Sequence, residues 1–466
     1  MKHGSTRIKS NSLNPEERAN ALGSEAIPSL LIRMSIPSII AMTVNAFYNL
    51  VDAIFIGYLG TSAIGAVSVA FPIFAMVGAF GLLFGIGTAS YISRLLGSKD
   101  KSRADQTASV SIFISSLVSV LFVFAGFFLL QPLLKNFGAT DSIMPYAQSY
   151  TRILLFGSFF TILNMNLNHI VRSEGNAKLS MTAMLAGAFS NILLDPIFIF
   201  VFHWGIAGAA IATVVSQALT TYLLFRYFFQ KSSYLHIRKK YFTWNTSIFI
   251  EIVKIGFPAF IRQFLASFTI ALLNLAASSY GDAAVASIGI TLRILSMGMF
   301  PLFGFAQGFQ PIAGYNFGAK RFDRLLTSVK LSYIWSSIFC VGFTILSLVF
   351  SKQIISWFSV DPLVIEIGRK TIFAVTVLFP FFGYQIITAV LFQAMGDGLP
   401  SAILSLARQG IFLIPAIIIL PKFFQLDGVI FSQTVADFLT LFITLAFSLR
   451  IVKKLNAKAN SSSAIL

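Results

Sequence analysis

Long apolar runs separated by short polar segments dominate the chain from residue 33 onward. Because the hydrocarbon core of a bilayer is about 30 Å thick, a helix that crosses it needs about 20 mostly apolar residues. The runs reach that length, so the pattern predicts twelve membrane-spanning helices. They cover residues 33–57, 66–93, 107–130, 146–168, 180–202, 206–228, 251–277, 285–313, 329–350, 371–394, 402–421 and 427–449.

Composition restricts the class of protein further. Hydrophobic residues make up 56% of the 466 residues and charged residues only 11%, against roughly 25% charged residues in soluble domains. A water-soluble fold has too little interior for so much apolar surface, so an all-α integral membrane protein is expected. Cys340 is the only cysteine, which excludes an internal disulfide and a cysteine-based metal site. Residues 1–28 are polar and lack the apolar core of a signal peptide.

The 34 Lys and Arg residues indicate the orientation in the membrane. Twenty-one of them lie in the two tails and in every second gap between spans, whereas five lie in the alternate gaps. Cytoplasmic loops are enriched in Lys and Arg, so we expect both termini in the cytoplasm of a multi-pass protein of the cell (plasma or inner) membrane, surrounded by lipid. The net charge of +17 then follows from topology, and no nucleic acid partner is expected.

The chain repeats itself at an offset of 221 residues. The matching positions include Pro37 and Pro258, Gly60 and Gly281, Ala63 and Ala284, Gly87 and Gly308, Gly97 and Gly318, and Gly175 and Gly396. Six spans per half give both halves the same orientation, which predicts two parallel six-helix bundles related by a pseudo-two-fold axis along the membrane normal. The expected parts are a cytoplasmic tail (1–28), a first bundle (29–229), a cytoplasmic linker (230–250), a second bundle (251–450) and a cytoplasmic tail (451–466). Two bundles that face each other across a cleft are typical of secondary transporters.

Three acidic residues, Asp52, Asp195 and Asp437, lie within the predicted spans. A charge at bilayer depth costs at least about 2.5 kcal/mol, so each of them is a candidate functional residue. Asp52 lies five residues and Asp195 seven residues from the outer ends of their spans, which places them within about 3 Å in depth. The 221-residue shift matches both to apolar residues of the second half, so this acid pair belongs to the first half alone.

Polar side chains surround the two acids at the same predicted depth. The set comprises Tyr48, Asn49, Asp52, Asn191, Asp195 and Thr213. Tyr48 and Asn49 share a helical face with Asp52, and Asn191 lies one turn before Asp195. Carboxylate, amide and hydroxyl oxygens are ligands for a monovalent cation or members of a proton relay. The sequence therefore predicts a binding site for H⁺ or Na⁺, with a polar seam closed by hydrogen bonds alone as the alternative.

The spans of the second half carry arginines, namely Arg262, Arg293 and Arg408, together with Asp437. One interpretation is a salt-bridged packing network of these four residues, in which Arg262 and Arg293 are expected to join Asp437. The alternative is that the arginines contact substrate. The candidates for lining the substrate cleft are Gln263, Asn274, Arg293, Met297 and Gln307.

Motifs for enzymatic chemistry are absent from the sequence. It contains no GxxxxGK(S/T) nucleotide motif and no Ser/His/Asp or His/Glu constellation. ATP is therefore not the expected energy source, the protein is not expected to be an enzyme, and no cofactor is expected. H⁺ or Na⁺ is the expected coupling ion, and no other metal is expected.

Several stretches resemble the multidrug and toxic compound extrusion (MATE) transporters, over residues 28 to about 452. These stretches are Asn49-Leu-Val-Asp52-Ala-Ile-Phe-Ile-Gly57, Tyr91-Ile-Ser-Arg-Leu-Leu-Gly97, Asn191-Ile-Leu-Leu-Asp195-Pro196 and Gly208-Ala-Ala-Ile-Ala-Thr213. Acids in spans one and five, with none in span seven or ten, are similar to the prokaryotic DinF-like branch. The resemblance implies that Asp52, Asn191 and Asp195 bind Na⁺ or H⁺, with Thr213 nearby.

The resemblance also implies an antiporter that exports amphipathic, often cationic, drugs or dyes in exchange for the inward-moving ion by alternating access. A monomer is expected. The alternatives are a lipid-linked precursor flippase of the same superfamily and a passive channel. A flippase is expected to have additional spans and a cationic cleft in the first half, where this chain has acids. A channel does not require a duplicated scaffold whose spans are broken by proline and glycine.

Overall fold

The computed structural model describes residues 14–230 and 232–463, and every regular element within these ranges is helical. The predicted tails reach beyond them, since residues 1–13 and 464–466 lie outside the described part of the chain, as does residue 231 of the predicted linker. The first half contains α1 (Pro15–Ser24), α2 (Ile27–Gly57), α3 (Thr61–Gly97), α4 (Lys101–Asn136), α5 (Met144–Ser173), α6 (Ala177–Pro196), the π-helical turn η1 (Ile197–Val201) and α7 (Gly205–Phe229).

The second half repeats this order with more interruptions. After the short 3₁₀ turn η2 (Lys239–Tyr241) it contains α8 (Thr246–Ser278), α9 (Asp282–Gly318), α10 (Phe322–Val349), α11 (Ser351–Ser356), α12 (Pro362–Thr376), α13 (Phe379–Met395), α14 (Gly398–Leu406), the π-helical turn η3 (Ala407–Leu413) and α15 (Ile414–Ser463). The predicted C-terminal tail thus continues α15 as helix as far as Ser463.

The described helices account for the twelve predicted spans. Ten are long and apolar enough to cross a membrane, and α12 with α13, joined by a bend of 43°, form a further one. The last of the ten runs from Gly398 to Ser461 and is divided by Gln425, whose φ of 51° is not helical. This break separates two predicted spans, so the protein is a multi-pass, all-α membrane protein.

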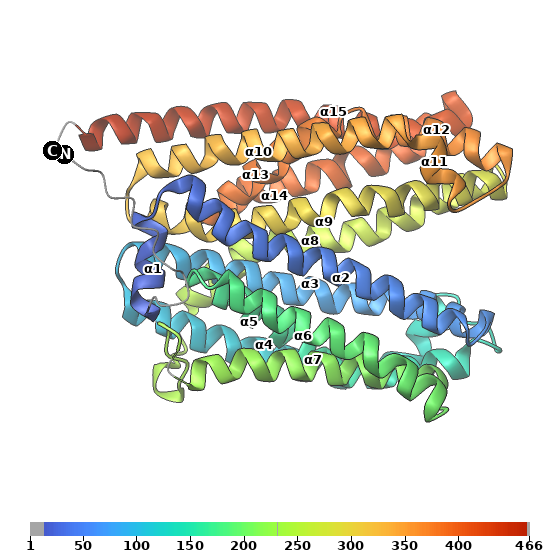
Figure 1. The fold of residues 1–466 in the computed structure, drawn as a ribbon, viewed down its shortest axis with the longest axis horizontal. Helices are drawn as coiled ribbons and strands as arrows, with labels where there is room; N and C mark the ends of the chain where they lie inside the picture. Colours follow the sequence, from blue (N-terminus) through green and yellow to red (C-terminus); the bar gives the residue numbers. More distant parts are fainter. Residues whose placement is uncertain (1–13, 231, 464–466) are drawn as a thin grey trace.

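The two halves form separate bundles that lie side by side. In Figure 1, α2 to α7 (blue to green) fill one side of the molecule and α8 to α15 (yellow to red) fill the other. Residues with positive φ recur at the same places in both halves. These pairs are Gly60 and Gly281 (100° and 92°), Lys99 and Lys320 (64° and 57°), Gly175 and Gly396 (84° each), and His203 and Gln425 (55° and 51°). The predicted repeat is therefore present in the backbone as well as in the sequence.

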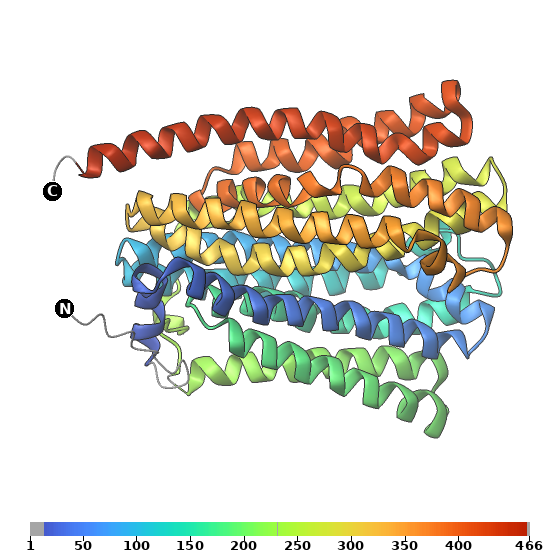
Figure 2. The same cartoon turned by 45° about the horizontal axis from the view of Figure 1, so that its top comes forward.

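The first described helix, α1, and the last residues of α15 lie at the same end of the molecule (Figure 2). We call this the basic end, defined by α1 and the loops 98–100, 174–176 and 319–321, and the opposite end the far end. Polar caps begin several helices at the basic end, because a side-chain oxygen there accepts an otherwise unpaired first-turn N–H. Asn14 accepts from the N–H of Glu17 to start α1, and Asp100 accepts from that of Arg103 to start α4.

The halves are sealed against each other in the basic-end portions of α3, α8 and α9. Gly87 lies so close to α8 that a Cβ there would be 2.1 Å from the carbonyl oxygen of Ile252, and a Cβ at Gly256 would be 1.9 Å from that of Leu83. The Nη2 of Arg94 forms an ion pair with Glu251 across the same interface at 3.1 Å. Backbone contact at glycines and an ion pair therefore close the passage between the halves at this end.

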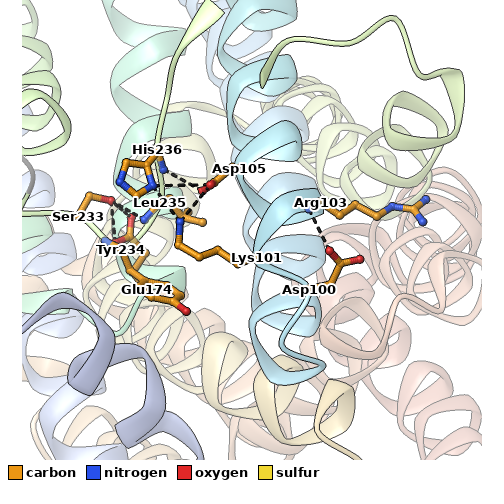
Figure 3. A network of polar contacts seen from close by, with 9 residues as sticks. All are labelled: Asp100, Lys101, Arg103, Asp105, Glu174, Ser233, Tyr234, Leu235 and His236. Carbon is orange, nitrogen blue, oxygen red and sulfur yellow. Dashed lines mark hydrogen bonds and ion pairs between the residues drawn. The ribbon is translucent and has the colours of Figure 1, made fainter. Parts of the chain in front are cut away.

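The linker between the halves is bound to the first half by two buried carboxylates (Figure 3). Asp105 accepts a hydrogen bond from the backbone N–H of His236 at 2.8 Å, and Lys101 donates to its other oxygen at 3.1 Å. Glu174 accepts from the Ser233 hydroxyl at 2.7 Å and from the backbone N–H of Tyr234 at 2.8 Å. Burial raises the pKa of the Glu174 carboxyl to about 7, although these hydrogen bonds oppose the shift.

Candidate functional site

The two acids of the first half lie together between α2, α6 and α7, as their predicted depths require. Asp195 is completely buried and Asn191 is 1% exposed. The Asn191 amide donates to Asp195 Oδ1 at 3.2 Å and to the Thr213 hydroxyl at 3.4 Å. The carboxyl group of Asp52 is near enough to that of Asp195 for the two to interact electrostatically. Four of the six predicted site residues thus form one cluster.

Three oxygen atoms of this cluster are buried acceptors without a hydrogen-bond partner among the described residues: Asp52 Oδ1, Asp195 Oδ2 and Asn191 Oδ1. A buried acceptor that is left unpaired costs about 1–3 kcal/mol, and more where it belongs to a charged group. Two neighbouring carboxylates cannot both stay ionised in a low-dielectric site unless a cation neutralises them. A proton or a cation bound here would satisfy these oxygens and neutralise the pair.

Tyrosine side chains flank the acids. Tyr48 interacts electrostatically with both Asp52 and Asp195. Tyr150 of α5, which is 5% exposed, interacts with the same two acids. Tyr150 was not among the predicted site residues, although it lies close to the far end of α5, at the depth of the acids. Asn49 is placed differently, because its amide donates to the backbone and side-chain oxygens of Asn45 at 2.6 and 3.2 Å.

A cavity of about 430 Å³ extends from this cluster into the first half. Its lining includes Tyr48, Asn49, Asn191 and Thr213 near the acids, and Asn164, Asn168, His169, Arg172 and Gln217 beyond them. The Asn168 amide donates to Asn164, whose amide donates to Gln217 of α7. These side chains were also missed, although the pair of asparagines four residues apart in an apolar span is a signal of a polar helix face.

The five residues predicted to line the substrate cleft fall into two groups. Gln263 and Gln307 line this cavity and also a second cavity of about 270 Å³ in the other half, so they stand where the two meet. Asn274, Arg293 and Met297 are exposed on the far-end portions of α8 and α9, outside both cavities. For these three, contact with substrate stays a prediction.

The predicted salt-bridged network of the second half is present only in part, because Arg408 and Asp437 pair, whereas the expected roles of Arg262 and Arg293 are wrong. Asp437 pairs with Arg408, whose Nε donates to Oδ1 at 2.6 Å and whose Nη2 donates to Oδ2 at 3.4 Å. Arg262 forms no ion pair with Asp437, and Arg293 is exposed. The reason lies in the π-helical turn η3, which carries Arg408 and packs against α15, the helix of Asp437. Such a turn is not visible in a 3.6-residue sequence pattern.

Comparison with known proteins identifies relatives of the whole chain. A sequence model of the MatE family matches residues 37–197 and 258–419, one match in each half, and the two begin 221 residues apart. The multidrug export protein MepA of Staphylococcus haemolyticus is 32% identical over 426 residues, which cover 90% of this chain and 93% of that protein. MepA of Staphylococcus aureus strain MRSA252 is 29% identical over 408 residues, 87% of this chain and 90% of that one.

Solved structures are similar over almost the same extent. A crystal structure of MATE in the bent conformation superposes with a TM-score of 0.88 at 27% identity, covering 96% of this chain and 99% of that one. The outward-facing conformation of a multidrug resistance MATE family transporter of the MOP superfamily superposes with a TM-score of 0.87 at 26% identity, covering 96% and 97%.

Proposed function

The chain belongs to the MatE family, and we propose that it exports amphipathic organic compounds, often cationic ones, in exchange for inward-moving H⁺ or Na⁺. Drug export is what the names of its MepA relatives state, and the matched part of the chain contains both bundles and both cavities. The relatives named above give no support to the alternative of a lipid-linked precursor flippase. The protein acts as a transporter without catalytic chemistry and without a bound cofactor.

The observation that carries the ion-coupling proposal is the group of three orphan oxygens on Asp52, Asn191 and Asp195. A protein that never bound a cation here would leave these acceptors unpaired at a cost of several kcal/mol in sum. Amide and hydroxyl pairs would fill the same space at a lower cost, so the carboxylates have a use beyond packing. Binding of H⁺ or Na⁺ satisfies the oxygens and neutralises the pair.

The charge asymmetry indicates the orientation of the protein in the membrane, and the seal indicates the side toward which it is closed. We place the basic end in the cytoplasm, because Lys and Arg concentrate there, and the far end outside the cell (plasma or inner) membrane. In this conformation the halves touch at the basic end through Gly87 and Gly256, which corresponds to a transporter closed toward the cytoplasm. The similarity to an outward-facing MATE family transporter supports this assignment.

Substrate occupies the two cavities, which adjoin at Gln263 and Gln307. Their volumes of about 430 and 270 Å³ and their mixture of aromatic, methionine and amide side chains suit drug-sized amphipathic molecules. The protein works as a monomer within the lipid, since each chain holds both halves of the cleft.

The test is gradient-driven efflux of a cationic dye by the purified full-length chain in proteoliposomes. Asp52→Asn and Asp195→Asn keep the shape of the side chains and remove the ionisable group. Each is expected to abolish efflux driven by an imposed H⁺ or Na⁺ gradient while the protein still inserts into the membrane. Asp437→Asn is also expected to leave ion coupling intact, although it removes the partner of Arg408 and is expected to lower stability.

Efflux by Asp52→Asn at the parental rate under the same gradient would show that Asp52 does not belong to the coupling site. Imposing the H⁺ and Na⁺ gradients separately identifies the ion. The driving force suffices, because one charge moving through 100 mV supplies about 2.3 kcal/mol, which supports a roughly fifty-fold substrate gradient.

A further inference from the structure

A third cavity, of about 520 Å³, lies at the basic end of the first half. Its walls come from Arg18 of α1, from residues 32–40 of α2 and from residues 175–181 around the start of α6. We call this cavity the lateral groove. It shares no lining residue with the two cavities described above, so it is separate from both of them.

One wall of the lateral groove is an apolar strip on α2. Ile32, Ile36 and Ile40 recur every four residues and are 48%, 50% and 40% exposed. Asn45, which lines the first cavity, follows Ile36 by nine residues, or about two and a half helical turns, and so lies on the opposite face of α2. The strip therefore faces away from the interior of the protein and toward the surrounding lipid.

The part of the lateral groove nearest the basic end carries three cations, Arg18, Arg33 and Lys178. Arg33 precedes Ile40 by seven residues, which places it about 10 Å nearer the basic end along α2. The charge of Arg18 acts on Arg33, so two like charges are held close together. Arg18 donates from Nη2 to the Ser232 carbonyl at 3.1 Å, and the Nε atoms of both arginines lack a hydrogen-bond partner among the described residues.

Two carboxylates act on these cations and leave a positive balance. Glu25 forms an ion pair with Arg33 at 2.9 Å. Glu174 acts electrostatically on Arg18, but its oxygens accept hydrogen bonds from the linker. Even when both carboxylates are counted, the three cations outnumber them. An arginine pair with a positive balance is suited to a phosphate group, which accepts charge-assisted hydrogen bonds from guanidinium groups.

We propose that the lateral groove binds an anionic glycerophospholipid of the cytoplasmic leaflet. Its phosphate lies between Arg18 and Arg33, with Lys178 as a further cation, and one acyl chain follows the isoleucine strip deeper into the membrane. The order of the groove matches the order of the lipid, because basic residues at the cytoplasmic surface attract anionic headgroups and the apolar strip lies at the depth of the chains. A soluble phosphate would leave the strip unused, and a cationic drug would be repelled by the arginines.

The test compares two lipids with the same acyl chains, dioleoylphosphatidylglycerol and dioleoylphosphatidylcholine. Their binding to the full-length protein in detergent is measured by native mass spectrometry. Arg18→Gln is expected to weaken binding of the anionic lipid about fivefold or more and binding of the zwitterionic lipid less than about twofold. Lys453→Gln is the matched control, since it makes the same change in net charge at an exposed position of α15, and it is expected to change neither lipid.

Ile36→Trp is a second, independent variant, because it fills the apolar part of the lateral groove and keeps every charge. It is expected to weaken binding of the anionic lipid about threefold or more, whereas Ile345→Trp, at a 55% exposed position of α10, is expected to have no effect. An excess of glycerol 3-phosphate is not expected to displace the lipid.

The inference would be overturned by equal losses for both lipids in Arg18→Gln, by the same loss in Lys453→Gln, or by displacement with glycerol 3-phosphate, which would indicate a site for soluble phosphate. The titration uses no ion gradient and no exported compound. Its outcome is therefore independent of whether the proposed export function is correct.

Discussion

The seal at the basic end allows a quantitative test of alternating access with a single methyl group. In Gly87→Ala the added Cβ would lie 2.1 Å from the carbonyl oxygen of Ile252, whereas ordinary contact begins at 3.4 Å. The shortfall is about 1.3 Å, and both sides of the contact are backbone that cannot rotate away. To accept the methyl group, α3 and α8 must therefore move apart at the point where the halves touch.

The energetic effect follows from the cost of overpacking, which is about 1–3 kcal/mol. This cost applies to the sealed state and is absent once the halves have separated at the basic end. The ratio of sealed to open molecules is therefore expected to fall by roughly 5- to 150-fold. A transporter shifted in this way keeps its ion site but returns slowly to the conformation that is open at the far end.

The assay measures access to a side chain beneath the seal. Cys340 is the only native cysteine and is completely buried, so Cys340→Ser gives a background free of thiols. Ser90→Cys is the reporter, because Ser90 is 0% exposed and donates to the Gln393 carbonyl across the interface. Maleimide labelling of the solubilised full-length chain is expected to be at least about fivefold faster in Gly87→Ala than in the background.

Gly78→Ala in the same helix is the matched control. A Cβ at Gly78 has no atom within 4 Å, and the substitution raises helix propensity as much as it does at Gly87. Labelling of Ser90→Cys at the same rate in both variants would refute the reasoning, because it would mean that α3 and α8 absorb the methyl group without opening the seal.

Three further predictions concern other parts of the molecule. Arg408→Leu or Asp437→Leu alone is expected to lower stability in detergent by about 3–5 kcal/mol, and the double variant to recover most of the loss in thermal unfolding; additive losses would contradict the pairing. Because the pKa of Glu174 is raised to about 7 from 4.5, the folded state binds the proton more tightly, so its contribution to stability falls as the pH rises from about 4.5 to 7 and is constant above; Glu174→Gln is expected to flatten the dependence of Tm on pH in that range. In the thiol-free background, a cysteine at Asp282 is expected to react with an impermeant maleimide outside intact cells and one at Ser102 is not, and labelling at Ser102 would contradict the orientation.

The acid cluster was predictable because it depends on regular geometry alone. Because the rise per residue of an α-helix is constant, the number of residues between a side chain and the end of its span gives its depth in the membrane. The helical period likewise places Asn191 on the same helix face as Asp195. Asp52, Asp195 and Thr213 come from three different spans, yet the structure brings them together as depth requires. The repeat was equally accessible, since Gly175 and Gly396 mark turns whose positive φ restricts the residue type.

The arrangement of the second half was not predictable by the same means. The choice between Arg262 and Arg408 as partner of Asp437 depends on a π-helical turn and on helix rotation, which tertiary packing sets. Depth in the membrane also does not distinguish an exposed arginine from one that lines a cavity. Arg293 is exposed, whereas Arg262 lines the cavity of the second half. The sequence pattern identified the charged residues within the spans, but tertiary packing determines which residues each of them contacts.

The first helix of each half connects the sites to the seal. α2 carries Asp52 toward the far end, contacts Gln307 through the Met42 sulfur at 3.5 Å where the cavities meet, and reaches α9 at the basic end, where the Ser35 hydroxyl donates to the Phe305 carbonyl. Pro37 lies between the site and the seal and removes one backbone hydrogen bond, so the helix bends there more easily than elsewhere.

α8 repeats this design with different chemistry. Pro258 lies at the position that matches Pro37, with Gly256 of the seal just before it and Arg262, which lines the cavity of the second half, one turn after it. In the proposed mechanism, ion binding in one half and substrate binding in the other therefore act on Pro37 and Pro258, two equivalent weak points beside one seal. Neutralising Asp52 and Asp195 would relieve the repulsion between them near the far end of α2. A bend at Pro37 or Pro258 would move the residues that line both cavities. The coupling that we propose thus requires no direct contact between ion and substrate, because each would bias the same closure of the basic end.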